Sequence, residues 1–235
     1  MKQGLVLDKV VLLGRTFDEY ARYFALDPGA LRGQAILDVA SGVSSFCAEA
    51  NEQSLNVTAC DLIYEWGLEK IAARCQPDLD HVLDSIGGLQ TYRWDFYQSP
   101  ERLRTYRERA YQTFLADYPT HRGTRYVSGK LPDLPFRDRQ FDLTLVSYLL
   151  FVYEDQLDYA FHRQSLLEIM RVTRGEARIY PLVSFEARRC GYLDALRRDP
   201  DLRQFRFQEV ATDFEFLANS NFYLQIQHDS PRPHD

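Results

Sequence analysis

The chain has only four cysteines in 235 residues, and no two of them are separated by two residues. Their spacing forms neither a zinc-binding pattern nor a disulfide framework, so we expect reduced, buried thiols in a cytoplasmic protein. Apolar runs long enough for a signal peptide or a membrane span are lacking. An excess of positive charge is lacking too. The 28 basic and 34 acidic residues give a net charge of −6, which argues against nucleic acid or an anionic membrane as a partner.

The length and the 45% apolar content favour one α/β domain with an insertion, at residues 1–228, followed by a polar tail at 229–235 that we expect to be disordered. Apolar and β-branched runs predict strands at residues 36–39, 57–60, 125–127, 141–146, 177–182, 205–210 and 222–226. Helical spacing predicts helices at 44–53, 65–75, 100–117, 161–172 and 188–198, with one or two more within 8–27.

The alternation of these elements predicts a doubly wound, mostly parallel seven-stranded sheet. The short connection between the last two strands favours an antiparallel hairpin at the sheet edge. Residues 76–120 are too many for a simple connection, so we interpret them as an inserted helical cap or lid.

Two apolar runs end in carboxylates, the first at Asp38 and the second at Asp61. The first run continues into the small residues Ala40, Ser41 and Gly42, and Gly42 precedes Asp61 by 19 residues (61 − 42). Small residues let the backbone approach a nucleotide-type cofactor, and the second acid can accept hydrogen bonds from ribose hydroxyls. Simpler explanations are that Asp38 caps the following helix and that Asp61 is a strand-end acid in solvent.

Four passages together resemble the class I S-adenosylmethionine-dependent methyltransferases. The turn Asp38-Val-Ala-Ser-Gly-Val-Ser44 is similar to the family's D-x-G-x-G-x-G loop, and Asp61 matches the acid after its second strand. Residues 131–147 (LPDLPFRDRQFDLTLVS) resemble the segment L-P-F…F-D-L-V-x-S, and residues 171–180 (RVTRGEARIY) resemble R-V-L-K-P-G-G. The chain departs from the family by having Ala40 and Ser44 in place of glycines, whose Cβ atoms restrict positive φ, and by having Arg174-Gly175-Glu176 in place of Pro-Gly-Gly.

The resemblance implies that the cofactor is S-adenosyl-L-methionine. The backbone of Ala40, Ser41 and Gly42 would follow its methionine part, Asp38 would face its ammonium group, and Asp61 would bind its ribose hydroxyls.

The same resemblance places Leu62 near the adenine, the Ser147 carbonyl near the ammonium group, and Tyr148 at the methyl group. Arg15 and Tyr20 belong to an N-terminal region that folds over the cofactor in this family, and a guanidinium suits the cofactor's carboxylate. A surface arginine and a core tyrosine are the alternative.

For the acceptor the resemblance implies a small molecule. Candidate pocket residues are aromatic or imidazole side chains that exclude water or stack on a substrate: Tyr92, Trp94, Tyr97, Tyr148, Tyr153 and His162. His162 has the pKa range of a general base, although a structural role is the alternative. We predict no metal site. Methyl transfer can proceed by positioning the nucleophile, without a dedicated base.

Two other functions stay open. The loss of two loop glycines is compatible with a non-catalytic binding or regulatory protein of methyltransferase fold. An NAD-dependent oxidoreductase would need glycines at 40, 42 and 45, of which only Gly42 is present.

The arginines of residues 101–109 alternate with glutamates, so we expect a solvated helix face rather than a nucleic-acid site. Oligomeric state is not readable from the sequence.

Overall fold

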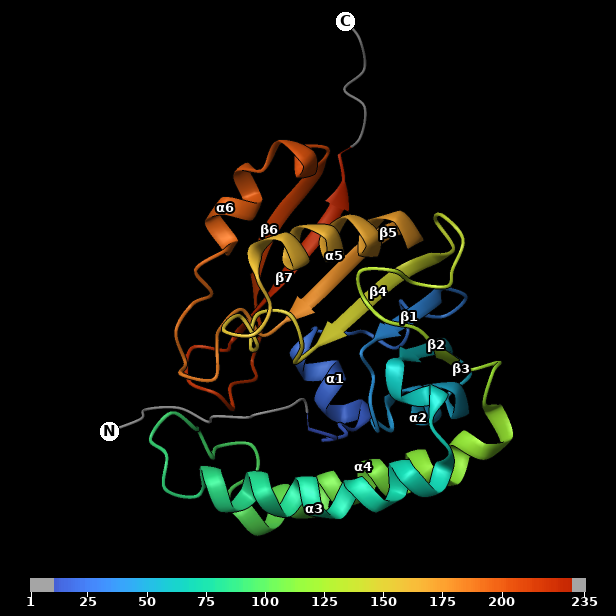
Figure 1. Ribbon diagram of the computed structural model, residues 1–235, viewed down its shortest axis with the longest axis vertical. Coiled ribbons are helices and arrows are strands. Elements are labelled where there is room, and N and C mark those ends of the chain that lie inside the picture. Colours follow the sequence, from blue (N-terminus) through green and yellow to red (C-terminus); the bar gives the residue numbers. More distant parts are fainter. Residues whose placement is uncertain (1–10, 230–235) are drawn as a thin grey trace, which may run out of the picture.

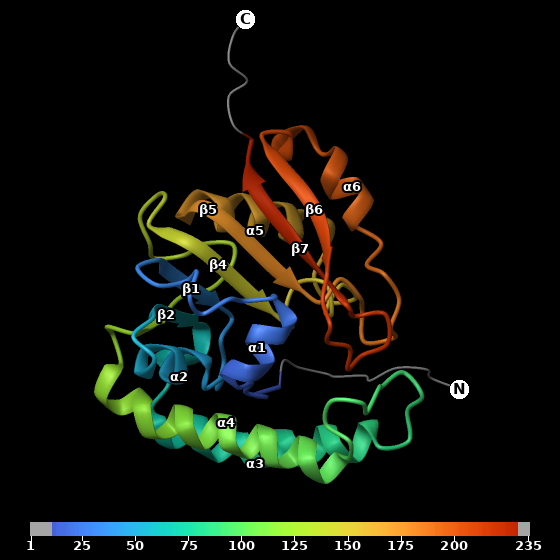
Figure 2. The same cartoon turned by 180° about the vertical axis from the view of Figure 1, so that it is seen from behind.

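The computed structural model describes residues 11–229, which build a central sheet with helices on both faces (Figures 1 and 2). The seven strands are β1 (Ala35–Val39), β2 (Asn56–Asp61), β3 (Tyr126–Ser128), β4 (Phe141–Ser147), β5 (Thr173–Tyr180), β6 (Phe205–Ala211) and β7 (Phe222–His228). Their order is β3-β2-β1-β4-β5-β7-β6. The strands from β1 to β5 pair in parallel, and β7 is antiparallel to both β5 and β6. The predicted fold class, with its antiparallel final hairpin, is confirmed.

The six α-helices are α1 (Phe17–Tyr23), α2 (Phe46–Glu52), α3 (Leu68–Ile86), α4 (Pro100–His121), α5 (Tyr159–Val172) and α6 (Leu193–Arg198), within residues 11–229. Two 3₁₀ turns accompany them, η1 (Leu62–Glu65) and η2 (Pro200–Leu202). Helices α5 and α6 cover one face of the sheet and α1 and α2 the other, while α3 and α4 run side by side along one flank of the domain (Figures 1 and 2).

The central strands are buried on both faces, which explains their nearly continuous apolar character. Because successive side chains of a strand point to opposite faces, β1 feeds two cores. Ile36 packs in the core beneath α1 and α2, whereas Leu37 and Val39 pack in the core beneath α5 and α6. Hydrophobic burial on both sides therefore fixes the sheet between two helical layers.

The register of the central strands brings their carboxyl ends level with one another. Val39 pairs with Cys60 on one side and with Val146 on the other. The next residues along the chain, Ala40, Asp61 and Ser147, therefore lie at the same edge of the sheet.

Within residues 11–27, the structure has a single α-helix, α1, where the apolar spacing allowed one or two. Thr16 is its N-cap, and a capping box joins Thr16 to Glu19. The Glu19 carboxylate accepts hydrogen bonds from the Thr16 N–H at 2.8 Å and from its hydroxyl at 3.0 Å. Two donors that a helix start would otherwise leave unpaired are satisfied.

The insertion differs from its predicted boundaries. A helix was predicted to end at residue 75, but α3 continues through Pro77 to Ile86, and α4 runs past residue 117 through Pro119. A proline removes one backbone hydrogen bond, a loss that packing between the two long helices offsets. The helix predicted at 188–198 is wrong over its first part, since α6 begins only at Leu193.

The predicted tail and the first residues of the region 8–27 lie outside the described residues, which end at 229 and begin at 11. Among helices of the described chain, each is too short or too polar to cross a lipid bilayer.

Candidate active site

A cavity of about 390 Å³ lies where β1, β2 and β4 end. This is the point where the strand order reverses, with β2 and β3 on one side of β1 and β4 and β5 on the other. Ligands of open α/β sheets bind at such a point. The structure brings ten predicted residues to this cavity: Arg15, Tyr20, Ala40, Ser41, Gly42, Asp61, Leu62, Ser147, Tyr148 and Tyr153.

The loop after β1 adopts the left-handed conformation at two positions, Ala40 with φ of 57° and Gly42 with φ of 57°. The N–H of Ala40 donates to the Cys60 carbonyl at 2.8 Å, which holds the turn on β2. The Tyr64 hydroxyl donates to the Gly42 carbonyl at 2.8 Å. The loop therefore keeps the shape of a glycine-rich turn although Ala40 carries a Cβ, at a cost of about 1 kcal/mol.

Replacing Ala40 with glycine is expected to leave stability unchanged or to raise it by up to about 1 kcal/mol. The left-handed strain disappears, which offsets the greater freedom of glycine in the unfolded chain. Ala48, buried in α2, is the matched control, and its replacement by glycine should cost about 1 kcal/mol or more. Urea unfolding measures both variants. A loss for Ala40→Gly equal to that for Ala48→Gly would show that the turn carries no strain.

Ser44 does not share this conformation, and its side chain has a partner. Its hydroxyl accepts a hydrogen bond from the backbone N–H of Arg15 at 3.1 Å. A glycine at this position would leave that N–H without its partner. The serine thus attaches the chain before α1 to the loop after β1, a contact between residues 29 positions apart.

Asp61 sits between two backbone donors at the end of β2. One carboxylate oxygen accepts from Gly42 N–H at 2.8 Å and the other from Ile63 N–H at 3.0 Å. Burial raises the pKa of Asp61, while these hydrogen bonds to Ile63 and Gly42 lower it. Each oxygen has a further lone pair, so the carboxylate can still accept two hydroxyl groups from the cavity.

Asp38 lies beneath the cavity and contacts it through Tyr20. Its side chain is fully buried, and the Tyr20 hydroxyl lies 3.0 and 3.1 Å from its two oxygens. Burial raises the pKa of Asp38 to about 7, against the lowering effect of the Ser41 and Tyr20 hydroxyls. The Tyr20 ring stacks on Phe46 with centroids 4.2 Å apart, which fixes the phenol over the carboxylate. Asp38 is not among the residues that line the cavity, and its predicted place facing a ligand's ammonium group, directly or through water, stays a prediction.

Tyr148 follows β4 in the left-handed conformation, with φ of 51°. Its N–H donates to the Tyr180 carbonyl at 2.7 Å, so the sheet hydrogen bonding continues one residue past the strand. The Arg15 guanidinium carbon lies 3.9 Å from the centre of the Tyr148 ring. Such backbone strain is commonly kept where a side chain has to point into a site.

The other predicted acceptor residues divide into two groups. Tyr153 lines the main cavity and Tyr92 lines a smaller neighbouring one, whereas Trp94 and Tyr97 pack against Phe216. His162 is not brought to either cavity. Its imidazole is fully buried, with its ring nitrogens 2.8 Å from the Asp158 carbonyl and 3.0 Å from the Leu150 carbonyl. That environment matches the structural alternative for His162.

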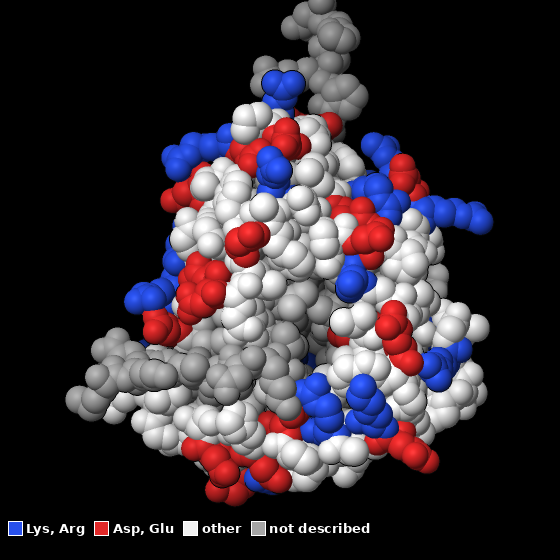
Figure 3. Space-filling view, viewed as in Figure 1, with Lys and Arg blue, Asp and Glu red and all other residues white. Residues whose placement is uncertain are grey.

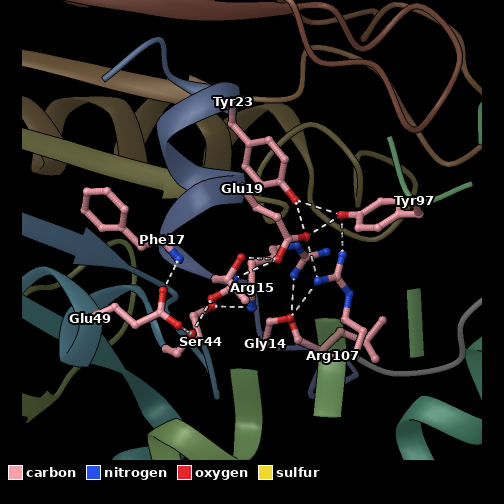
Figure 4. Close-up of polar contacts among 12 residues, drawn as sticks. Gly14, Arg15, Phe17, Glu19, Tyr23, Ser44, Glu49, Tyr97 and Arg107 are labelled. Atoms are coloured by element: carbon pink, nitrogen blue, oxygen red, sulfur yellow. Dashed lines mark hydrogen bonds and ion pairs between the residues drawn. The ribbon is translucent and has the colours of Figure 1, made fainter. Parts of the chain in front are cut away.

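A buried ion pair, which sequence reasoning missed, connects α4 to α1 (Figure 4). The guanidinium of Arg107 lies 2.7 Å from the Glu19 carboxylate and donates to the Gly14 carbonyl at 3.1 Å and to the Tyr97 hydroxyl at 2.8 Å. Glu19 also accepts hydrogen bonds from the Tyr23 and Tyr97 hydroxyls. Burial alone would raise the pKa of Glu19, but the Arg107 charge and these hydrogen bonds hold it below its usual range.

The expectation of a solvated face on residues 101–109 is therefore wrong for Arg107. Arg104 does follow it, since it pairs with Glu108 one turn on and with Asp80 of α3. The available signal was the Thr16-x-x-Glu19 pattern of a capping box, but its partner 88 residues away has no local signature.

Several lining residues were also missed, namely Val11, Leu13, Trp66 and Phe185. They come from connecting segments rather than from strand ends. Gly14 explains how the first of these segments reaches the cavity: a Cβ there would lie 2.1 Å from the Val43 carbonyl oxygen, so only glycine allows this approach.

Charges of both signs are interspersed over the face seen in Figure 3. Within residues 11–229, no group of three or more histidine, cysteine, aspartate or glutamate side chains is placed to hold a metal ion.

The strand order, the antiparallel β7 and the cavity at the switch point define a protein of class I methyltransferase fold. The chain is 36% identical over 225 residues to the uncharacterized protein MJ0045 of Methanocaldococcus jannaschii, covering 95% of this chain and 98% of that protein. It therefore belongs to the same protein family as MJ0045. No family model matches the sequence.

The chain is also similar to solved structures, two of which follow. One is the magnesium protoporphyrin IX methyltransferase ChlM of Synechocystis PCC 6803 with bound SAM, at 14% identity and a TM-score of 0.47, covering 91% of this chain and 78% of that one. The other is a SAM-dependent methyltransferase from Aquifex aeolicus, at 12% identity and a TM-score of 0.41, covering 90% of this chain and 95% of that one.

Proposed function

We propose that this protein binds S-adenosyl-L-methionine in the cavity at the sheet edge and transfers its methyl group to a small-molecule acceptor. The observation that carries the proposal is Asp61. Its carboxylate stands at the end of β2, is held by two backbone N–H groups, and lines the cavity beside the loop after β1. That is the arrangement that binds the ribose of a nucleotide-type cofactor.

The residues present fit such a cofactor. The turn at Ala40 and Gly42 keeps the required backbone shape, and a Cβ on Gly42 would meet no atom within 4 Å, so the loop is open on that side. Leu62 is 44% exposed and lines the cavity, a placement suited to packing on an adenine ring. Tyr20 and Ser147 complete this end, with the buried carboxyl group of Asp38 behind Tyr20.

When bound, the cofactor supplies an electrophilic methyl group on a positively charged sulfur. The chain's own contribution is positioning. Tyr148 is held over the cavity by its strained backbone and by its contact with Arg15, so it is placed to align an acceptor. His162 has no part in this proposal, because its ring is enclosed among backbone carbonyls.

Isothermal titration with S-adenosylhomocysteine tests the cofactor. Micromolar binding is expected for the wild type, and Asp61→Ala should weaken it by about 100-fold, as expected for losing two hydrogen bonds to a charged group. Asp133→Asn is the control, since Asp133 is exposed and lies in the loop after β3 without lining the cavity. Thermal melts of each variant separate loss of binding from loss of folding.

Wild-type protein that binds no S-adenosylhomocysteine at millimolar concentration would contradict the proposal. The alternative of a non-catalytic protein of this fold would then become the working hypothesis. Equal binding of S-adenosylhomocysteine by the wild type and by Asp61→Ala would show that the cofactor does not contact this carboxylate.

A further inference from the structure

The cavity has two unlike ends. One end is formed by the loops after β1, β2 and β3 and carries Asp61. The other is apolar and is lined by Val11, Leu13, Leu149, Tyr153 and Phe185. A second cavity of about 40 Å³ shares Leu13, Arg15, Tyr148 and Phe185 with this apolar end. Its remaining wall consists largely of aliphatic side chains of α3, such as Leu83, together with Phe216 and Leu217. This end of the cavity therefore suits the hydrocarbon or aromatic part of a ligand.

No general base lines the apolar end or the second cavity within residues 11–229. The titratable groups there are three tyrosines and three arginines: Tyr92, Tyr148, Tyr153, Arg15, Arg74 and Arg107. Burial raises the pKa of all three phenols, that of Tyr153 to about 12. They stay protonated at neutral pH, so an acceptor at this end has to bring its own nucleophilic electron pair.

The positive charge at this end comes from Arg15. Arg107 is paired with Glu19 and Arg74 with Asp78, whereas Arg15 forms no ion pair with a carboxylate anywhere in the described part of the chain. Its Nη1 donates to the Leu13 carbonyl at 2.7 Å, its buried Nε has no hydrogen-bond partner, and its guanidinium carbon lies 3.9 Å from the centre of the Tyr148 ring. Because this side chain lines the cavity and its charge has no ion-pair partner, its planar fork of N–H donors suits a carboxylate there.

We infer that the acceptor is an apolar carboxylic acid, bound as its anion by Arg15 with its hydrocarbon or aromatic body against Leu13, Phe185 and Leu83. The inference rests on the proposed function and names its substrate class. In the reaction, a carboxylate oxygen forms a bond to the methyl carbon while the carbon–sulfur bond breaks. The bonding pair remains on sulfur, the negative charge disappears into the methyl ester, and no proton has to be removed.

The sequence had favoured the cofactor's own carboxylate as the partner of Arg15. The geometry favours the acceptor because Arg15 borders the second cavity as well as the first, together with Tyr148 and Phe185. If Arg15 binds the acceptor, its replacement should weaken binding of the acid. If it binds the cofactor's carboxylate, its replacement should weaken binding of S-adenosylhomocysteine.

The experiment titrates wild-type protein, saturated with S-adenosylhomocysteine, with a series of straight-chain and aromatic carboxylic acids and with the primary amides of the same acids. Acids should bind and the amides should not. Arg15→Gln should weaken acid binding by about 10- to 100-fold and leave S-adenosylhomocysteine binding within about threefold. Arg15→Lys should give an intermediate loss, since it keeps the charge without the two-donor edge. Arg32→Gln, which removes an exposed arginine that precedes β1, is the control for net charge.

A product assay adds a chemical signature. With S-adenosylmethionine, the preferred acid should gain the mass of one methylene group, and mild alkali should release it again, as for a methyl ester.

Binding of S-adenosylhomocysteine without binding of any acid would overturn the inference and leave the proposed function intact. Loss of S-adenosylhomocysteine binding in a folded Arg15→Gln variant would overturn it in favour of the cofactor's carboxylate. A product that resists alkali would overturn it in favour of another nucleophile. If Arg15→Gln does not fold, the comparison of acids with amides on the wild type still tests the inference, because amides that bind as tightly as the acids would contradict it.

Discussion

Replacing Arg107 with methionine is expected to lower the free energy of unfolding by about 3–5 kcal/mol. The substitution leaves Glu19, whose side chain is 0% exposed, as an uncompensated buried charge. It also removes the donors to the Gly14 carbonyl and the Tyr97 hydroxyl. Urea unfolding at pH 7 measures the effect.

The matched control is Arg104→Met on the same helix. Arg104 pairs with Asp80 at 2.6 Å, but the two side chains are 36% and 47% exposed, so the loss should stay below about 1 kcal/mol. Adding Glu19→Gln to Arg107→Met should recover part of the stability, because the remaining group is then neutral. Equal losses for Arg107→Met and Arg104→Met would show that the buried pair is not coupled as its geometry indicates.

Replacing Asp38 with asparagine is expected to remove a pH dependence of stability and to stabilise the protein at pH 8. The folded-state pKa of Asp38 is raised from 3.8 to about 7, chiefly by burial. A carboxyl group with a raised pKa contributes stability at low pH, and that contribution is lost as the pH rises from about 4 through about 7. The difference corresponds to about 4 kcal/mol as an upper figure, and asparagine keeps an oxygen for the Tyr20 hydroxyl.

Urea unfolding of wild type and Asp38→Asn between pH 4 and pH 8 measures this difference. The two proteins should converge near pH 4 and separate as the pH rises, with the variant more stable at pH 8. Asp133→Asn, at an exposed position, should follow the wild type throughout. Parallel curves for wild type and Asp38→Asn would mean that Asp38 is ionised without penalty.

The elements that sequence patterns predicted well are those whose signal is local. β4 is a nearly continuous apolar run because both of its faces are buried, and the final hairpin is marked by its short connection. The predicted boundaries were wrong where packing between distant segments overrides the local preference of a residue. The helices predicted to end at residues 75 and 117 continue through Pro77 and Pro119, because packing of α3 on α4 carries both helices through.

The site divides in the same way. Asp61 and Ser147 were predictable because parallel strands end at one edge of the sheet, so the end of each strand already indicates the cavity. Leu13 and Phe185 were not, because they reach the cavity from connecting segments. The contact between Asp38 and Tyr20 was not predictable either, because the two residues are 18 positions apart and no local pattern connects them.

Residues 11–16 form one wall of the cavity and are attached to both long helices of the insertion. The Leu12 N–H donates to Asp78 of α3 at 2.9 Å, and Arg107 of α4 binds the Gly14 carbonyl. Displacing this wall requires breaking a contact with each helix, so the two helices hold the width of the cavity. Substitutions in the pair that leave equilibrium affinity intact would then change how fast a ligand enters and leaves. Association and dissociation rates of S-adenosylhomocysteine are accordingly the quantities that connect the insertion to turnover.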